Sequence, residues 1–219
     1  MYTLYGGKYT RTMMLQMMMA EAGIEYKLIE IDMLKQQHRS PEYLAINPAG
    51  YIPAMITETG EVLHETHAIA LYLVDRHGLE DFGPQVGEEL RGSFLTGLFF
   101  MADDIEPILK MVFYPGEFVL EPGDSARMRQ KSLQLLLERL QLIENRLQQN
   151  GPWYLGERFS FIDIVIAFWT ATVEHYQAHD SLPAILQHKQ RVAARPSLRP
   201  LFDEWESSVK EFRNLSSGE

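Results

Sequence analysis

The stretch from Asn47 to Ile69 constrains the fold of this chain more than any other part of the sequence. It opens with Asn47-Pro48-Ala49-Gly50, which is typical of a turn, and then reaches Ile52-Pro53. A proline is tolerated at the first residue of a strand, and the residue before it favours extended geometry. The sequence therefore predicts a strand over residues 54–57, entered through Ile52-Pro53.

The second half of this stretch predicts a hairpin followed by a helix. Glu58-Thr59-Gly60 is typical of a tight turn, and residues 61–63 return as the partner strand. Apolar residues at helical spacing follow, and Thr66 is the expected N-cap. The stretch thus places a free backbone edge at Ile52 beside a helix N-terminus. Such an edge pairs with an extended peptide, and such a terminus binds a carboxylate.

Residues 1–77 and residues 88–219 differ in pattern and predict two domains. In the first, short runs of aromatic and β-branched residues alternate with helical patterns in the order βαβαββα. Glycine and proline gather in residues 78–87, which predicts a linker. The second region contains helical patterns alone. We therefore expect an α/β domain followed by an all-α domain.

Three local features are also predicted. Five methionines within residues 13–19 are expected to fill the core rather than form a binding surface. Residues 88–113 form one helical pattern, in which Pro107 should cause a kink. Ser160 and Asp163 stand three residues apart before an apolar run, which is the pattern of a capping box. We assign this pair to structure rather than to chemistry.

Composition excludes several classes of function. The net charge is −10 and lysine and arginine form no cluster, so we expect no nucleic-acid partner. No apolar run reaches membrane-spanning length and no signal segment opens the chain, so we expect a cytoplasmic protein without membrane contact. The chain has no cysteine, which removes disulfides and a protein thiol nucleophile. Any thiol in the chemistry must arrive with a ligand.

Histidine pairs offer weak candidates for a metal site. His64 and His67 flank Glu65-Thr66, and His175 and His179 stand four residues apart on a predicted helix. Neither pair has an obvious third ligand, and the pattern His-Glu-x-x-His is absent. We expect no metal.

The stretch described first resembles the glutathione-binding half of cytosolic glutathione transferases. Ile52-Pro53 matches the cis-proline loop of their thioredoxin-like domain, and Glu65-Thr66 matches the acidic-hydroxyl pair that follows it. The block from Leu155 to Asp163 resembles the buried capping element of their helical domain. The resemblance spans roughly residues 1–212. It implies a thioredoxin-like first domain, glutathione as co-substrate, a small apolar electrophile, a homodimer and a role in detoxification.

The resemblance also implies which residues hold glutathione. The cysteinyl backbone should pair with Ile52, and Pro53 in the cis form holds that edge open. Glu65 suits the γ-glutamyl ammonium group, and the hydroxyl and amide of Thr66 suit its carboxylate.

This sequence offers weaker candidate residues for the glycine end of glutathione than for its γ-glutamyl end. Its carboxylate needs a cation or another donor, and Lys35 and His38 are the candidates, with Arg39 further away. Family members often have lysine or arginine directly before the Ile/Val-Pro pair. Tyr51 stands there in this chain, so part of that contact is in doubt.

The group that activates the glutathione thiol stays open between three residues. A free thiol has a pKa of about 8.5, so only about 3% is thiolate at pH 7 without a donor and a helix dipole. Tyrosine-type members would use Tyr5, and serine-type members would use the position of Thr10. We prefer Thr10 because it lies at the start of the first helix, and Tyr9 is a third candidate.

The second substrate should lie between the loop at Gly6–Thr10 and the kinked helix. Apolar side chains for this pocket come from both ends of that helix and from a later one: Phe99, Phe100, Met101, Phe113, Tyr114, Phe118 and Trp169. Most are expected in the core, because aromatic residues at helical spacing usually are.

Two other functions remain open. One is a glutathione-dependent isomerase, peroxidase or ether-cleaving lyase, although the double-serine loop of the isomerase branch is missing. The other is a non-catalytic binding or regulatory protein of the same fold. Retention of Pro53 with Glu65-Thr66 argues against the latter, whereas Thr10 and Tyr51 leave room for it.

Overall fold

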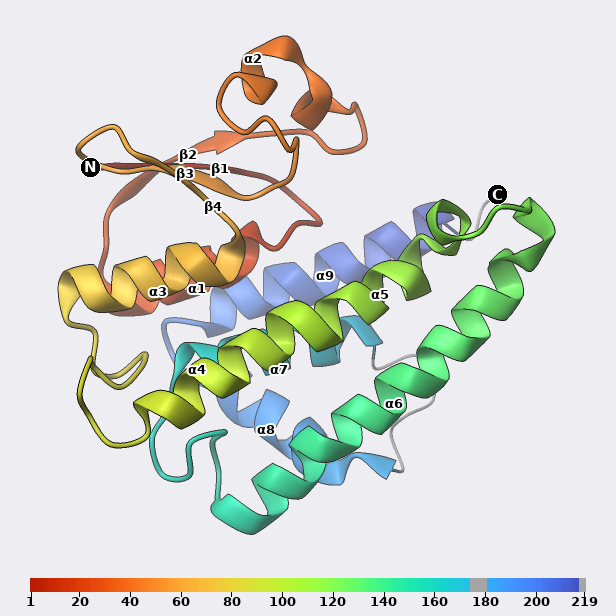
Figure 1. The fold of residues 1–219 in the computed structure, drawn as a ribbon. Coiled ribbons are helices and arrows are strands. Elements are labelled where there is room, and N and C mark those ends of the chain that lie inside the picture. Colours follow the sequence, from red (N-terminus) through yellow and green to blue (C-terminus); the bar gives the residue numbers. More distant parts are fainter. Residues whose placement is uncertain (174–180, 217–219) are drawn as a thin grey trace.

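The computed structural model of the protein describes residues 1–173 and 181–216 (Figure 1). A four-stranded sheet lies between α2 on one face and α1 with α3 on the other. The elements of this region are β1 (Tyr2–Gly6), α1 (Thr12–Ala22), β2 (Tyr26–Glu30), a 3₁₀ turn η1 (Gln37–Arg39), α2 (Pro41–Leu44), β3 (Ala54–Ile56), β4 (Val62–His64) and α3 (Thr66–His77). This order confirms the predicted βαβαββα arrangement.

The strand order in the sheet is β2-β1-β3-β4. β1 pairs in parallel with β2 and antiparallel with β3, and β3 pairs antiparallel with β4. The register aligns Tyr5 with Ala54 and Ala54 with His64. The end of β1, the start of β3 and the end of β4 therefore lie in one row, with about 4.8 Å between neighbouring strands.

The remainder of the described chain is helical. Its elements are α4 (Arg91–Phe99), a π-helical turn η2 (Phe100–Ile105), α5 (Glu106–Phe113), 3₁₀ turns η3 (Pro115–Phe118) and η4 (Pro122–Asp124), α6 (Ser125–Asn150), α7 (Phe161–Val173), α8 (Pro183–Ala193) and α9 (Arg199–Ser216). None of the helices within residues 1–173 and 181–216 combines the length and apolarity that a membrane crossing requires. An α/β region followed by a helical region matches the predicted fold class, and the exact domain boundaries stay a prediction.

One continuous apolar core joins the two regions. The five methionines of α1 are all buried, which confirms that they pack in the core. They belong to the same cluster as the first residues of α7, where Phe161 and Ile162 are fully buried. Burial of this apolar surface stabilises both regions together, because α1 packs against α3 on one side and α7 on the other.

The predicted long helix over residues 88–113 was wrong in two details. It begins at Arg91 instead of Glu88, and the turn before Pro107 is π-helical. Pro107 has no N–H, so it cannot donate to the carbonyl of Asp103. The Glu106 N–H instead bonds to the Met101 carbonyl, five residues back.

The predicted capping box at α7 forms in a modified way. The Asp163 carboxylate accepts a bond from the Ser160 N–H at 2.7 Å, as expected. The Ser160 hydroxyl donates to the same carboxylate at 3.1 Å, while the Asp163 N–H bonds to the Ser160 carbonyl. The short aspartate thus lies close enough to take both groups of Ser160.

Candidate functional site

Three loops meet at one edge of the sheet. The row formed by Tyr5, Ala54 and His64 is the last row at this end in which β1, β3 and β4 pair with one another. The loop over residues 7–11 follows β1, Ile52-Pro53 precedes β3, and Glu65 follows β4. The structure therefore brings together the three segments that the sequence predicts for a tripeptide site.

The loop before β3 presents a free backbone edge. The Ile52-Pro53 peptide bond is cis, as predicted. The Tyr51 carbonyl accepts hydrogen bonds from the Tyr43 hydroxyl at 2.7 Å and the Asn47 side-chain amide at 2.8 Å. Within the described chain the Ile52 N–H and carbonyl have no backbone partner. Tyr43 and Asn47 hold the loop in place and leave the Ile52 edge open to an extended peptide.

Neither Tyr43 nor Asn47 was among the predicted site residues. Both side chains are buried, at 2% and 1% exposure. The signal for Asn47 was its place at the head of the Asn-Pro turn, because asparagine side chains often bond to nearby backbone. Nothing in the sequence pattern distinguishes Tyr43 from an ordinary core tyrosine.

The start of α3 carries an unsatisfied polar group. The prediction that Thr66 is the N-cap was wrong, because Glu65 takes that position with a φ of 74° and Thr66 is the first helical residue. The Thr66 side chain is fully buried and its hydroxyl has no hydrogen-bond partner among the described residues. A buried hydroxyl beside the free N–H groups of a helix N-terminus provides the donors that a carboxylate needs.

The loop after β1 holds Thr10 beside the start of α1. The Thr10 hydroxyl is buried, donates to the Gly7 carbonyl at 2.6 Å and lies 2.8 Å from the Thr12 hydroxyl. The N–H groups of Tyr9, Thr10 and Arg11 have no partner within the part of the chain that the structure describes. These N–H groups and the α1 dipole favour an anion at this position.

Gly7 is required for this loop conformation. A Cβ atom at Gly7 would lie 2.4 Å from the Ile31 carbonyl oxygen, which is backbone and cannot move aside cheaply. The Ile31 N–H also donates to the Gly6 carbonyl at 2.6 Å. The loop is therefore fastened to the end of β2.

The other two candidate donors lie in different surroundings. Tyr5 is half-buried beside Ile52, with its ring 6.2 Å from that of Tyr43. Tyr9 faces the end of α9, where its ring lies 5.4 Å from Phe212. Burial, together with a hydrogen bond to Glu211, raises the pKa of the Tyr9 phenol. Tyr5 thus lies nearer the tripeptide edge, whereas Tyr9 is held by α9.

The residues proposed for the glycine end lie beyond β2. Lys35 is exposed and pairs with Asp32 at 3.1 Å. His38 is half-buried, and burial with the charge of Arg39 lowers its pKa, so the imidazole is neutral at pH 7. Its Nδ1 atom has no partner in the described chain. The Tyr51 ring is 48% exposed and lies against two cations, Arg39 and Lys110.

A buried carboxylate connects this edge to the helical region. Glu106 is 4% exposed and accepts bonds from the Arg11 guanidinium at 2.6 Å and the Trp169 indole at 3.0 Å. The Nε2 atom of His67 lies 3.9 Å from the same carboxylate and has no hydrogen bond within residues 1–173 and 181–216. Sequence patterns did not predict this network, because Arg11 and Glu106 stand 95 positions apart.

His67 should make stability depend on pH. Burial lowers the pKa of His67, and the nearby Glu106 carboxylate only partly opposes this effect. As the pH falls from about 6.5, the unfolded histidine takes up a proton before the folded one does, so stability decreases until the lower folded-state pKa is passed. We expect His67→Leu to show a shallower decline of the urea unfolding midpoint on acidification. The exposed His64→Leu is the matched control, and equal slopes in all three proteins would contradict the prediction.

The seven side chains proposed for the second-substrate pocket separate into three groups. Met101 lies in the core at 1% exposure, and Phe100 packs against that core. Phe113 and Trp169 stack with centroids 6.5 Å apart and form an apolar wall. The exposed members are Phe99, Tyr114 and Phe118.

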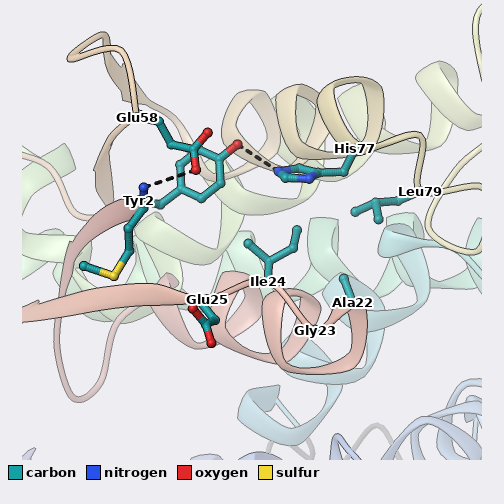
Figure 2. Close-up of a pocket in the computed structure, with 9 residues that line it drawn as sticks. Tyr2, Ala22, Gly23, Ile24, Glu25, Glu58, His77 and Leu79 are labelled. Carbon is teal, nitrogen blue, oxygen red and sulfur yellow. Dashed lines mark hydrogen bonds and ion pairs between the residues drawn. The ribbon is translucent and has the colours of Figure 1, made fainter.

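A recess of about 510 Å³ lies at the opposite end of β1 from this site. Figure 2 shows Tyr2, His77 and Glu58 around it, with the Tyr2 hydroxyl 2.8 Å from His77 Nε2. Because β1 runs from Tyr2 to Gly6, the recess is separated from the Thr10 loop by the length of the strand.

In the described residues no three histidine, aspartate or glutamate side chains are placed to share a metal ion. His64 and His67 lie on either side of Glu65-Thr66, and His64 is exposed while His67 is buried. His175 and His179 lie outside the described residues.

Comparison with known proteins identifies the two regions. The model of the glutathione S-transferase N-terminal domain matches residues 11–76, and that of the C-terminal domain matches residues 101–196. The disulfide-bond oxidoreductase YfcG of Escherichia coli is 29% identical over 184 residues, covering 81% of this chain and 83% of that protein. The maleylacetoacetate isomerase of Pseudomonas aeruginosa is 26% identical over 212 residues, covering 91% and 93%.

Solved structures share the whole fold. A glutathione transferase from Methylococcus capsulatus has 28% identity and a TM-score of 0.79, covering 94% of this chain and 98% of its own. The transferase URE2P6 of Phanerochaete chrysosporium, solved with oxidised glutathione, has 22% identity and a TM-score of 0.84, covering 94% and 97%. With both family domains matched in order on this fold, the chain belongs to the glutathione S-transferase family as a glutathione S-transferase-like protein.

Proposed function

We propose that the protein is a glutathione transferase that activates the glutathione thiol for attack on an electrophilic second substrate. The orphaned Thr66 hydroxyl carries this proposal, because a buried polar atom without a partner marks a place for a ligand group. The γ-glutamyl carboxylate fits there, the exposed Glu65 is placed for its ammonium group, and the cysteinyl backbone fits the free Ile52 edge. This arrangement directs the sulfur toward the loop of Thr10.

The chain itself supplies the electrostatics of thiol activation. Thr10 and the free N–H groups of residues 9–11 would stabilise the thiolate at the start of α1. Lowering the thiol pKa by about 2 units stabilises the anion by about 2.7 kcal/mol. In the reaction the thiolate sulfur forms a bond to carbon and the leaving group departs with its electron pair. The thiol proton leaves to solvent before this step.

The glutathione half of the proposal is tested by binding. We expect Thr66→Val and Glu65→Ala each to raise the Kd for glutathione about tenfold, because each removes a charge-assisted hydrogen bond. Isothermal calorimetry measures the change, and the exposed Thr96→Val on α4 is the matched control. Unchanged affinity in both variants, or a wild type that is not retained on immobilised glutathione, would remove the proposed site.

Thiol–disulfide exchange is a second candidate function. It is favoured by the 29% identical relative that is named a disulfide-bond oxidoreductase. With no cysteine in the chain, the attacking thiolate would again belong to glutathione. It would form a mixed disulfide and release one substrate thiolate. A second glutathione thiolate would then attack the glutathione sulfur of the mixed disulfide, forming glutathione disulfide and releasing the second substrate thiolate. Turnover of an activated aryl halide without turnover of a disulfide favours transfer, and the reverse favours exchange.

We also propose that the protein forms a homodimer in the cytoplasm, as the sequence resemblance implies. Support for the dimer comes from apolar side chains exposed on α4 and α6, namely Phe99, Leu137 and Leu142. A pair of long helices with such exposed groups is suited to burial against a second copy.

A further inference from the structure

A cationic rim bridges the sheet region and the helical region. It consists of Arg39, which follows β2, and Lys110 on α5, with the Tyr51 ring between these two elements. The Arg39 guanidinium lies 5.8 Å from the Tyr51 centroid, and the Lys110 ammonium lies 4.9 Å from it. Two cations from distant parts of the chain therefore meet at the residue that precedes Ile52.

Both cations are available to an anion. Among the described residues no carboxylate lies within 4 Å of either. Arg39 is oriented by a bond from its guanidinium to the Ala49 carbonyl at 3.2 Å. Glu106, one helical turn before Lys110, already accepts bonds from Arg11 and Trp169. On a chain of net charge −10, two cations without acidic partners at the mouth of a site favour an anionic ligand.

The position of Lys110 relates this rim to the second substrate. Phe113 follows Lys110 by three residues on α5, so these two side chains share a helix face, and Tyr114 is the residue at which the helix ends. Phe113 belongs to the apolar wall that stacks on Trp169. A flat apolar body against this wall would therefore lie on the helix face that also carries Lys110.

We propose that Lys110 and Arg39 bind a carboxylate carried by the second substrate, which is therefore an anionic aromatic electrophile rather than a purely apolar one. This inference rests on the proposed transferase function and specifies its substrate class. Arg39 was also a more distant candidate for the glycine carboxylate of glutathione. Lys35 and His38 remain for that end of the tripeptide, whereas Lys110 belongs to the helical side. The Tyr51 ring lies between Arg39 and Lys110 and offers an aromatic surface to both cations.

The test compares a chloronitrobenzoate with its methyl ester as electrophiles at saturating glutathione. In Lys110→Met we expect the KM for the carboxylate substrate to rise about tenfold, the loss usual for one charge-assisted bond. The KM for the ester and the KM for glutathione should stay within about twofold. The exposed Lys27→Met on β2 is the matched control, and added salt should shrink the wild-type preference for the carboxylate.

Three results would overturn the proposal. An equal change for acid and ester would show a packing effect, and no change would show that Lys110 contacts no substrate. A rise confined to the KM for glutathione would assign Lys110 to the glycine carboxylate instead. A wild type that turns over neither electrophile would remove the transferase function.

The carboxylate site is then tested separately, by calorimetry with the S-(carboxynitrophenyl) conjugate of glutathione and its methyl ester. Wild type should bind the acid about tenfold more tightly than the ester, and Lys110→Met should lose this difference. Equal binding of acid and ester by the wild type would refute the site on its own terms.

Discussion

Replacing Asp163 with alanine should lower the free energy of unfolding by about 3–5 kcal/mol, the largest stability change that we expect from a single substitution in this chain. The Asp163 carboxylate is fully buried at the start of α7. It accepts bonds from the Tyr154 N–H at 2.8 Å, from the Ser160 N–H at 2.7 Å and from His188 Nε2 at 2.8 Å.

The cost arises from the groups left behind. Alanine would leave two buried N–H groups, the Ser160 hydroxyl and one imidazole without their acceptor, and each orphaned group costs about 1–3 kcal/mol. Tyr154 precedes α7, Ser160 lies at its start, and His188 belongs to α8, which packs against α7. Because α7 also packs against α1 in the sheet region, disrupting the start of α7 would loosen the core that the two regions share.

Urea unfolding followed by fluorescence and circular dichroism measures this change at one fixed protein concentration, since a dimer's apparent stability depends on concentration. Asp163→Asn is expected to lose less, because its amide oxygen can still accept while its NH₂ group opposes a donor. The exposed Asp203→Ala should stay within about 0.5 kcal/mol of wild type. A loss below about 1 kcal/mol in Asp163→Ala would show that water replaces the carboxylate.

Local sequence patterns predicted those parts of the site that depend on short segments. The strand entry at Ile52-Pro53, the hairpin and the helix after it follow one another along the chain, and local turn chemistry specifies them. Ser160 and Asp163 could be paired for the same reason. The cis form of Pro53 was implied by the family resemblance. The meeting of the Thr10 loop with the Ile52 edge and the start of α3 was implied by the family resemblance.

Contacts between segments that are distant in the sequence could not be predicted from local patterns. From the sequence, Glu106 would be predicted as an ordinary surface glutamate of an amphipathic helix. Only the π-helical turn before it and the approach of Arg11 make it a buried, hydrogen-bonded carboxylate. His188 joins Asp163 across 25 residues for a similar reason. The exact position of the α3 start also escaped prediction, because Glu65 adopts a positive φ that is uncommon for glutamate.

The second large effect is expected from removing the Thr10 hydroxyl. We expect Thr10→Val to lower kcat for an aryl halide about 20-fold at pH 7, with the Kd for glutathione within about twofold. Valine keeps the shape of threonine but cannot donate a hydrogen bond to the sulfur. The pKa of the bound thiol should then rise toward its free value of about 8.5, which the ultraviolet absorbance of the thiolate would report.

The hydroxyl hydrogen is already used in the structure, and this makes the prediction specific. Thr10 donates to the Gly7 carbonyl at 2.6 Å, so glutathione must draw the hydrogen away from that carbonyl. If the Gly7 bond persists, the N–H groups of residues 9–11 alone would hold the thiolate and Thr10→Val would be nearly silent.

Conservative variants separate these possibilities and the rival donors. Thr10→Ser keeps a hydroxyl and should retain activity within about threefold, whereas a loose loop alone would reduce activity in both Thr10 variants. Tyr5→Phe and Tyr9→Phe should also stay within about threefold, because neither removes the donor that we assign. A 20-fold loss in Tyr5→Phe with an active Thr10→Val would move the donor to Tyr5, which packs against the cluster that contains Ile52.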